Sequence, residues 1–280
     1  MATKLVIVEG LPGTGKTSTA RYVADLLAGS GQDVSLFQEG SLDHPADFEG
    51  VALLKAEDFE RMARDYPGHA TLLRERAAAC GHGLLVPYLL LHEDAGLPPA
   101  LLAGLERHDV YSEMHPQETY SSLLLWRWRA FAAVQAHQDA TAVFECSLLQ
   151  NPLCALFVQR DANLASVRSL VEQLVHEVAA LQPKLIYLHQ PDIAATIDRV
   201  LPERSSRWRD FVVAYHTQQG YGKALGLHGL AGYVEVLRAR KAMELAIVEG
   251  LPVETLLLDT SGEDWEEGRR RIRSFLLSTP

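Results

Sequence analysis

The residues with the clearest chemistry lie close to the start of the chain. Gly10–Thr17 read GLPGTGKT, which matches the pattern G-x-x-x-x-G-K-[ST] of a phosphate-binding loop. Gly10 and Gly15 let backbone N–H groups wrap phosphate oxygens without obstruction by Cβ atoms, and the N-terminus of a following helix favours anions. Lys16 reaches the β- and γ-phosphates in such a loop, and the Thr17 hydroxyl binds Mg²⁺. The residues predicted to contact the nucleotide phosphates are Gly10, Pro12, Gly13, Thr14, Gly15, Lys16, Thr17 and Ser18.

The segments on either side of this loop have the periodicity that the motif requires. Lys4–Glu9 is a short apolar, β-branched run typical of a buried parallel strand. Lys16–Ala28 has the spacing of a helix, which ends at Gly29–Gly31. Because the motif lies between a predicted strand and a predicted helix, the sequence predicts a nucleotide phosphate site.

Further strands and helices are expected to alternate along the chain. Together they indicate the sheet that positions this loop. After the first strand, we expect strands at Val34–Phe37, Ala142–Glu145, Lys184–Leu188 and Glu254–Asp259, separated by helical segments. This pattern predicts an α/β fold of the P-loop NTPase type, with a doubly wound, five-stranded parallel sheet and helices on both faces. We expect residues 1–280 to form one such domain, with a helical insertion at 50–140 over the carboxyl edge of the sheet, where such proteins bind ligands.

Two carboxylates lie at the carboxyl ends of the second and third predicted strands. Glu39 comes just after Val34–Phe37, and Glu145 is the last residue of Ala142–Glu145. Side chains at the carboxyl ends of these strands face the cleft beside the phosphate loop. A carboxylate there can accept the proton of a hydroxyl group or hold Mg²⁺.

The hexapeptide IVEGLP occurs both at Ile7–Pro12 and at Ile247–Pro252. The second copy follows a good helix former and is predicted to finish the helix at Ala231–Glu249. It lacks the GTGKT that follows the first copy, so the sequence predicts a single phosphate site.

Composition excludes several classes of function. The chain has 280 residues, 48% of them hydrophobic, and a formal net charge of −10, which disfavours nonspecific binding to nucleic acid or to an anionic membrane. No apolar run approaches about 18 residues, and the apolar stretch in MATKLVIVEG is interrupted too soon, so we expect neither a membrane helix nor a signal peptide. Cys80, Cys146 and Cys154 form no CxxC pair and are expected to be buried, reduced thiols, so we expect a cytoplasmic protein. No HExxH or HxxxH pattern occurs, so a metal site built from protein side chains alone is not expected.

The phosphate loop, the segment Lys184–Val200 and the final strand and helix together resemble the P-loop kinases of small molecules, which include nucleoside, nucleoside-monophosphate, shikimate and antibiotic kinases. In that superfamily a short helix with an arginine follows the fourth strand, and a mobile lid with further arginines comes next. The resemblance therefore implies a lid at 200–230 and catalytic roles for Arg199 and Arg204, with Arg207 as a further candidate. The stretches QEGSLDHPAD, FECSLLQNP and YHTQQGYGK are also similar to segments of functionally undefined bacterial P-loop proteins.

The same resemblance implies roles for the carboxylates. Glu39 stands where these kinases often bind or deprotonate the acceptor hydroxyl, with Asp43 as a rival, and Glu145 stands where a carboxylate, usually aspartate, supports Mg²⁺. Glu145 is also a candidate for the base, because some nucleoside kinases have Glu-Arg-Ser where this chain has Glu-Cys-Ser. Which of the three acts as the base stays open. Arg127, Gln150 and Asn151 are further candidates for contacts with the acceptor.

The sequence thus predicts an enzyme with ATP and Mg²⁺ as cofactors. The expected reaction moves the γ-phosphoryl group of Mg-ATP to a hydroxyl of a small molecule such as a nucleoside, a sugar or an antibiotic. The predicted catalytic residues are Lys16, Glu39, Glu145, Arg199 and Arg204. No nucleic-acid or membrane partner is expected, and a homodimer is left open. The alternative is a nucleotide-dependent switch or ATPase that binds a protein partner; the absence of an NKxD motif and of an ABC-type signature disfavours it.

Overall fold

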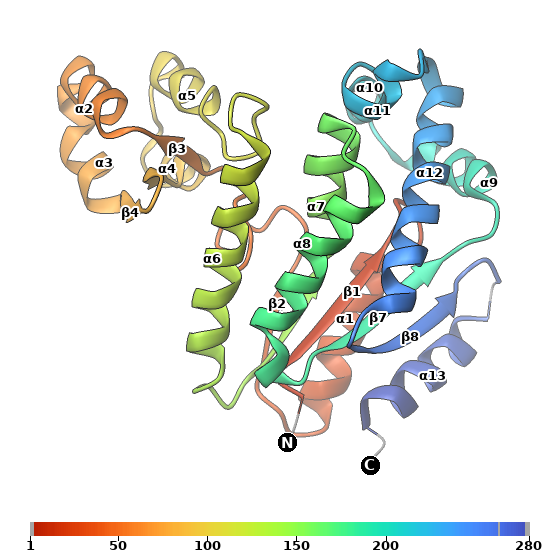
Figure 1. Cartoon of the computed structure of the whole chain (residues 1–280). Helices are drawn as coiled ribbons and strands as arrows, with labels where there is room; N and C mark the ends of the chain where they lie inside the picture. Colours follow the sequence, from red (N-terminus) through yellow and green to blue (C-terminus); the bar gives the residue numbers. More distant parts are fainter. Residues whose placement is uncertain (1–2, 263, 278–280) are drawn as a thin grey trace. The chain divides into compact units, whose positions relative to one another are not determined.

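The computed structural model describes residues 3–262 and 264–277, and these fall into two compact units (Figure 1). Unit 1 takes in the described residues of Met1–Glu39 and Trp128–Pro280, and unit 2 is Gly40–Arg127. No helix in the described ranges combines the length and the apolar character that a membrane span requires.

The core of unit 1 is a parallel sheet that contains, among the described residues, five strands in the order β2-β6-β1-β7-β8. The strands are β1 (Leu5–Gly10), β2 (Val34–Phe37), β6 (Thr141–Glu145), β7 (Lys184–His189) and β8 (Glu254–Asp259). Each begins and ends within about two residues of its predicted bounds. The prediction of an α/β fold with a five-stranded parallel sheet and flanking helices is confirmed.

Both faces of this sheet are buried, which explains why its strands are nearly continuous apolar runs. Alternate residues of β1, such as Val6 and Val8, pack in one cluster with Ala20, Val23 and Ile272 from the two helices on that face. On the opposite face, the Phe144 ring lies against Trp128 and Phe131, with ring centroids 6.1 Å and 4.8 Å away. The side chains therefore alternate between two helical layers (Figure 1).

Helical segments separate the strands of unit 1, as predicted. Their bounds are α1 Lys16–Gly29, α7 Gln150–Pro152, α8 Leu164–Glu177, α9 Ile193–Val200, α10 Ser206–Thr217, α11 Gly220–Ala224, α12 Gly229–Gly250 and α13 Trp265–Leu277, with a π-helical stretch at Leu153–Val158 and 3-10 turns at Ala179–Leu181 and Leu201–Glu203. The second IVEGLP ends α12, as predicted, whereas the first runs from β1 into the phosphate loop.

The region predicted as a lid, 200–230, consists largely of helices α10 and α11 in the structure. Val212 of α10 lies in a core cluster with Tyr233 and Leu237 of α12. The glycines there allow close packing: a Cβ atom at Gly220 would lie 2.3 Å from the Val158 carbonyl oxygen. The region is thus helical and packed against α12, and its role as a lid stays a prediction.

Unit 2 holds a three-stranded antiparallel sheet within its described residues, in the order β3-β5-β4. Its elements are β3 Ala52–Leu54, α2 Ala56–Asp65, a 3-10 turn at Pro67–His69, α3 Ala70–Arg76, β4 Ala78–Cys80, β5 Gly83–Val86, α4 Tyr88–Ala95 and α5 Pro99–Glu106; α6 (Gln117–Gln135) continues from unit 2 into unit 1. The expected helical insertion therefore also contains a small sheet, which was not predicted because runs of three or four apolar residues do not distinguish a strand from a helix. The unit also spans 40–127 instead of the expected 50–140.

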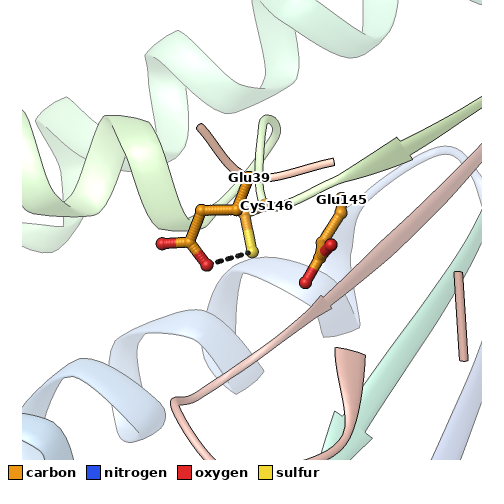
Figure 2. A group of neighbouring side chains, drawn as sticks. All are labelled: Glu39, Glu145 and Cys146. Atoms are coloured by element: carbon orange, nitrogen blue, oxygen red, sulfur yellow. Dashed lines mark hydrogen bonds between the residues drawn. The ribbon is translucent and has the colours of Figure 1, made fainter. Parts of the chain in front are cut away.

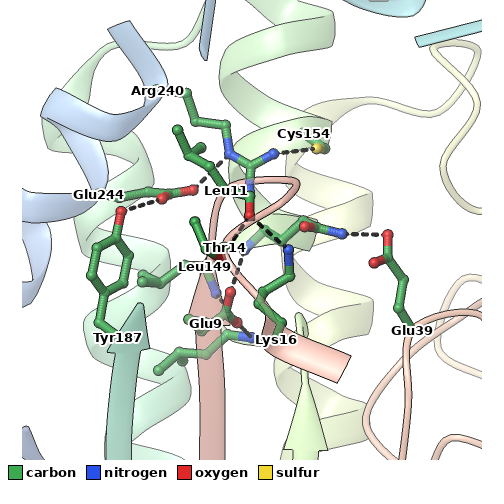
Figure 3. Close-up of polar contacts among 12 residues, drawn as sticks. Glu9, Leu11, Thr14, Lys16, Glu39, Leu149, Cys154, Tyr187, Arg240 and Glu244 are labelled. Atoms are coloured by element: carbon green, nitrogen blue, oxygen red, sulfur yellow. Dashed lines mark hydrogen bonds and ion pairs between the residues drawn. The ribbon is translucent and has the colours of Figure 1, made fainter. Parts of the chain in front are cut away.

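A buried ionic network fixes α12 within unit 1 (Figure 3). Arg240 Nε donates a hydrogen bond of 2.6 Å to Glu244 Oε1, and the Tyr187 hydroxyl of β7 donates one of 2.7 Å to Glu244 Oε2. The Arg240 and Glu244 side chains are 2% and 0% exposed. An uncompensated charge at this depth would be very unfavourable, so each partner depends on the other.

We predict that Arg240→Ala lowers the free energy of unfolding by about 3–5 kcal/mol, since it leaves Glu244 buried without its cation. Arg238→Ala on the same helix is the matched control, because its ion pair with Glu235 is about half exposed and is worth less than about 1 kcal/mol. Urea unfolding of both variants measures the difference; equal losses would contradict the assignment of Arg240 and Glu244 as a buried pair.

Candidate functional site

The turn that joins β1 to α1 has the backbone conformation of a glycine-dependent cradle. Gly10, Gly13 and Gly15 have φ values of 145°, 83° and 93°. A Cβ atom at Gly10 would lie only 2.3 Å from the Leu188 carbonyl oxygen of β7. The turn is closed by Thr14, whose hydroxyl donates a hydrogen bond of 2.9 Å to the Leu11 carbonyl oxygen. Cβ atoms at Gly13 and Gly15 would lie 2.9 Å from Val200 Cγ1 and 2.8 Å from the Trp265 ring, so only glycine suits this turn. An open turn of this kind at the N-terminus of a helix fits a bound phosphate.

Lys16 folds back across this turn (Figure 3). Its Nζ donates a hydrogen bond of 3.1 Å to the Leu11 carbonyl oxygen, and the residue is 6% exposed. Burial alone lowers the pKa of Lys16, but the acidic groups of Cys146, Glu39 and Glu9 outweigh it, and the pKa lies above its ordinary value. The lysine is therefore a buried cation beside the cradle.

Thr17 and Glu145 meet directly at the start of α1. The Thr17 hydroxyl donates a hydrogen bond of 2.6 Å to Glu145 Oε1. Glu145 ends β6, where the parallel register with β1 places it opposite Val8. Its second oxygen, Oε2, is buried and has no hydrogen-bond partner among the described residues. A hydroxyl and a carboxylate with a spare oxygen are ligands that suit Mg²⁺, so this pair fits the metal that the sequence predicts.

Glu9 is a site residue that the sequence analysis missed. It is fully buried, and its Oε1 accepts hydrogen bonds of 2.7 Å and 2.8 Å from the backbone N–H groups of Leu148 and Leu149, while Oε2 accepts one of 3.2 Å from Gln150. Burial raises the pKa of Glu9 to about 7, although the N–H groups of Leu149 and Leu148 lower it. The available signal was a carboxylate at the end of an apolar strand, directly before the first glycine of the loop.

Glu39 and Gln150, both predicted to face the acceptor, are in contact. Gln150 Nε2 donates a hydrogen bond of 2.6 Å to Glu39 Oε1, and the Cys146 thiol lies 3.6 Å from Glu39 Oε2 (Figure 2). Glu39 is exposed, whereas Gln150 and Cys146 are buried. Asn151 follows at the start of α7, and its backbone N–H donates to the Cys146 carbonyl oxygen at 3.3 Å. The structure thus gathers Glu39, Gln150 and Cys146 into one cluster.

The two predicted catalytic arginines have different surroundings. Arg199 Nη2 donates to Gln190 Oε1 at 3.0 Å and approaches the Gly13 carbonyl oxygen at 3.5 Å, so it reaches the phosphate loop. The Arg204 guanidinium instead lies over the Trp208 ring, 5.3 Å from its centroid. The geometry therefore associates Arg199 with the cradle, and the role of Arg204 stays a prediction.

Asp43 and Arg127 belong to unit 2. Arg127 Nη2 donates a hydrogen bond of 2.9 Å to the His44 carbonyl oxygen, and its guanidinium lies 4.9 Å from the centre of the Phe48 ring. These contacts make Arg127 part of the internal packing of unit 2. Asp43 is exposed beside His44. Acceptor-binding roles for both residues stay predictions.

No protein-family model matches this chain, and no curated protein matches it either.

The buried Glu9 carboxyl predicts a pH-dependent contribution to stability. Its pKa is about 7 in the folded protein against an ordinary value of 4.5, so between these values the folded state holds a proton that the unfolded state has released. Stability therefore falls as pH rises from about 4.5 to about 7, by about 3 kcal/mol from this group. Glu9→Gln has no such group, and its unfolding free energy should fall less over this range. Urea unfolding at several pH values checks this, and parallel pH profiles for the two proteins would contradict it.

Proposed function

We propose that this protein is a P-loop phosphotransferase that moves the γ-phosphoryl group of Mg-ATP to a hydroxyl of a small molecule such as a nucleoside, a sugar or an antibiotic-like compound. The observation that carries the proposal is the 2.6 Å hydrogen bond between Thr17 Oγ1 and Glu145 Oε1, next to the buried Lys16. It joins the two side chains that this chemistry needs for a metal ion, although they are far apart in sequence.

The topology supports a nucleotide site of the P-loop type. The glycine-rich turn follows β1, the central strand, whose neighbours are β6 on one side and β7 on the other. The chain order of the strands reverses at this point, where open parallel sheets bind ligands outside the carboxyl ends of their strands. The N-terminus of α1 adds a favourable potential for phosphate.

The residues of the cradle have distinct tasks in this proposal. Backbone N–H groups of Gly13–Thr17 bind phosphate oxygens, and Lys16 releases the Leu11 carbonyl oxygen to contact the β- and γ-phosphates. Thr17 and Glu145 hold Mg²⁺, which neutralises charge that develops on the phosphates. Arg199 hydrogen-bonds only to neutral oxygens in the contacts described, so it can turn toward a phosphate without breaking an ion pair.

Glu39 is the group best placed to orient or deprotonate the acceptor hydroxyl. It is exposed at the carboxyl end of β2, and the amide of Gln150 holds one of its oxygens at 2.6 Å. A general base must be within hydrogen-bond reach of the proton it accepts, and an accessible, oriented carboxylate meets that requirement. This feature favours transfer to an acceptor over a simple nucleotide switch.

The test is incubation with Mg-ATP and a library of metabolites and antibiotics, followed by mass spectrometry for phosphorylated products. We expect a product with the wild-type protein, and a loss of about 100-fold or more in kcat/KM with Lys16→Ala or Glu145→Gln, since each removes charge stabilisation of the transferring group. Glu39→Gln should lower kcat more than it changes KM. Arg74→Ala, an exposed residue of unit 2, is the control that should retain full activity.

Two outcomes would contradict the proposal. ATP hydrolysis with no phosphorylated product from a broad library would instead support a switch or ATPase. Full transfer by Lys16→Ala would exclude the phosphate loop from the mechanism.

A further inference from the structure

A group of potential metal ligands lies beside the phosphate loop and includes a thiol, a ligand that Mg²⁺ does not require. One ligand atom each from Glu39, Glu145 and Cys146 lies within 4.8 Å of the others (Figure 2). The register of the sheet explains their proximity: Phe37 of β2 pairs with Phe144 of β6, and the chains continue from there to Glu39 and Cys146. No motif in the sequence could show this, because the ligands come from two strands joined by a long insertion.

The distance between Cys146 and Glu39 matches one edge of a metal tetrahedron. Cys146 Sγ and Glu39 Oε2 are 3.6 Å apart. Two donors bound at about 2.3 Å (sulfur) and about 2.1 Å (oxygen) with a tetrahedral angle are separated by about 3.6 Å. A cation would therefore replace the thiol–carboxylate contact without requiring these two side chains to separate.

Glu145 supplies an independent indication of a ligand. It is 3% exposed, and its Oε2 has no hydrogen-bond partner within the described part of the chain. Leaving a buried carboxylate oxygen unsatisfied is unfavourable, and a bound cation would compensate it. Figure 2 shows the Glu145 carboxylate next to the Cys146 sulfur.

The thiol decides which kind of cation fits. Mg²⁺ takes hard oxygen ligands, whereas thiolates select softer ions such as Zn²⁺. Two carboxylates and a thiolate carry three negative charges, and a divalent cation together with the neighbouring Lys16 carries three positive charges, so the cluster would be balanced. We propose that Glu39, Glu145 and Cys146 bind one thiophilic divalent cation of the zinc class, with the fourth coordination position open.

This site goes beyond the proposed phosphotransfer, and the cation needs no nucleotide to bind. Glu145 belongs both to this site and to the proposed Mg²⁺ site. Zn²⁺ and Mg-nucleotide are therefore expected to compete, a consequence that rests on the proposed function, whereas binding of the cation alone does not.

The experiment is a titration of the nucleotide-free, full-length protein with Co²⁺, followed by absorption spectroscopy. We expect one equivalent of Co²⁺ to produce a thiolate-to-cobalt charge-transfer band, which Zn²⁺ abolishes because it binds such sites more tightly than Co²⁺. Cys146→Ser should lose the band, and Glu39→Gln should weaken Co²⁺ binding by about 10-fold or more. Cys80→Ser, which changes a thiol of unit 2, is the matched control and should keep both band and affinity.

The proposal is overturned if the wild-type protein gives no charge-transfer band, or if a folded Cys146→Ser protein retains it. Circular dichroism establishes whether Cys146→Ser is folded. Should that variant fail to fold, Glu39→Gln provides the test, because an exposed carboxylate can be replaced without loss of the core. Unchanged Co²⁺ affinity of Glu39→Gln would overturn the site, and weakened affinity would support it.

Discussion

The hydrogen bonds between the buried Glu9 carboxylate and the backbone of residues 148–150 hold the candidate site together. Glu9 directly precedes Gly10, the first residue of the phosphate loop, and its partners begin two residues after Cys146. These bonds tie the end of β1 to the turn after β6, so the cradle and the carboxylate beside it are positioned as one unit. A change in this contact would alter the phosphate loop and the metal ligands together.

Because this region is buried, the balance between its positive and negative groups strongly affects its stability and its binding of ions. Lys16, Glu9 and Glu145 are all at least nine-tenths buried, and their interactions are stronger than they would be in water. The Lys16 cation is stabilised by negative neighbours, and its present partner is a neutral carbonyl oxygen. Binding of an anion at the cradle and of a cation at Glu145 would each satisfy groups that the protein alone leaves without an ionic partner.

The sequence predicted those features that depend on neighbouring residues. The glycine-rich loop, the five strands and the long helices of unit 1 follow from local spacing, whereas the metal-binding roles expected for Thr17 and Glu145 stay predictions. Glu9 was missed because its partners lie about 140 residues away in the chain. Cys146 was interpreted as an inert buried thiol, since its proximity to Glu39 depends on the pairing of β2 with β6. In unit 2 the strands are too short for their apolar residues to reveal a periodicity.

We propose that the turn after β1 binds a nucleotide phosphate group together with a metal held by Thr17 and Glu145. Calorimetric titration with ADP tests it most directly, with and without Mg²⁺, on the wild-type protein and on Thr17→Ala. We expect saturable binding of ADP that weakens about 10-fold or more when Mg²⁺ is removed, and a much smaller effect of Mg²⁺ in Thr17→Ala. The absence of saturable ADP binding, or binding by the wild-type protein that is indifferent to Mg²⁺, would contradict it.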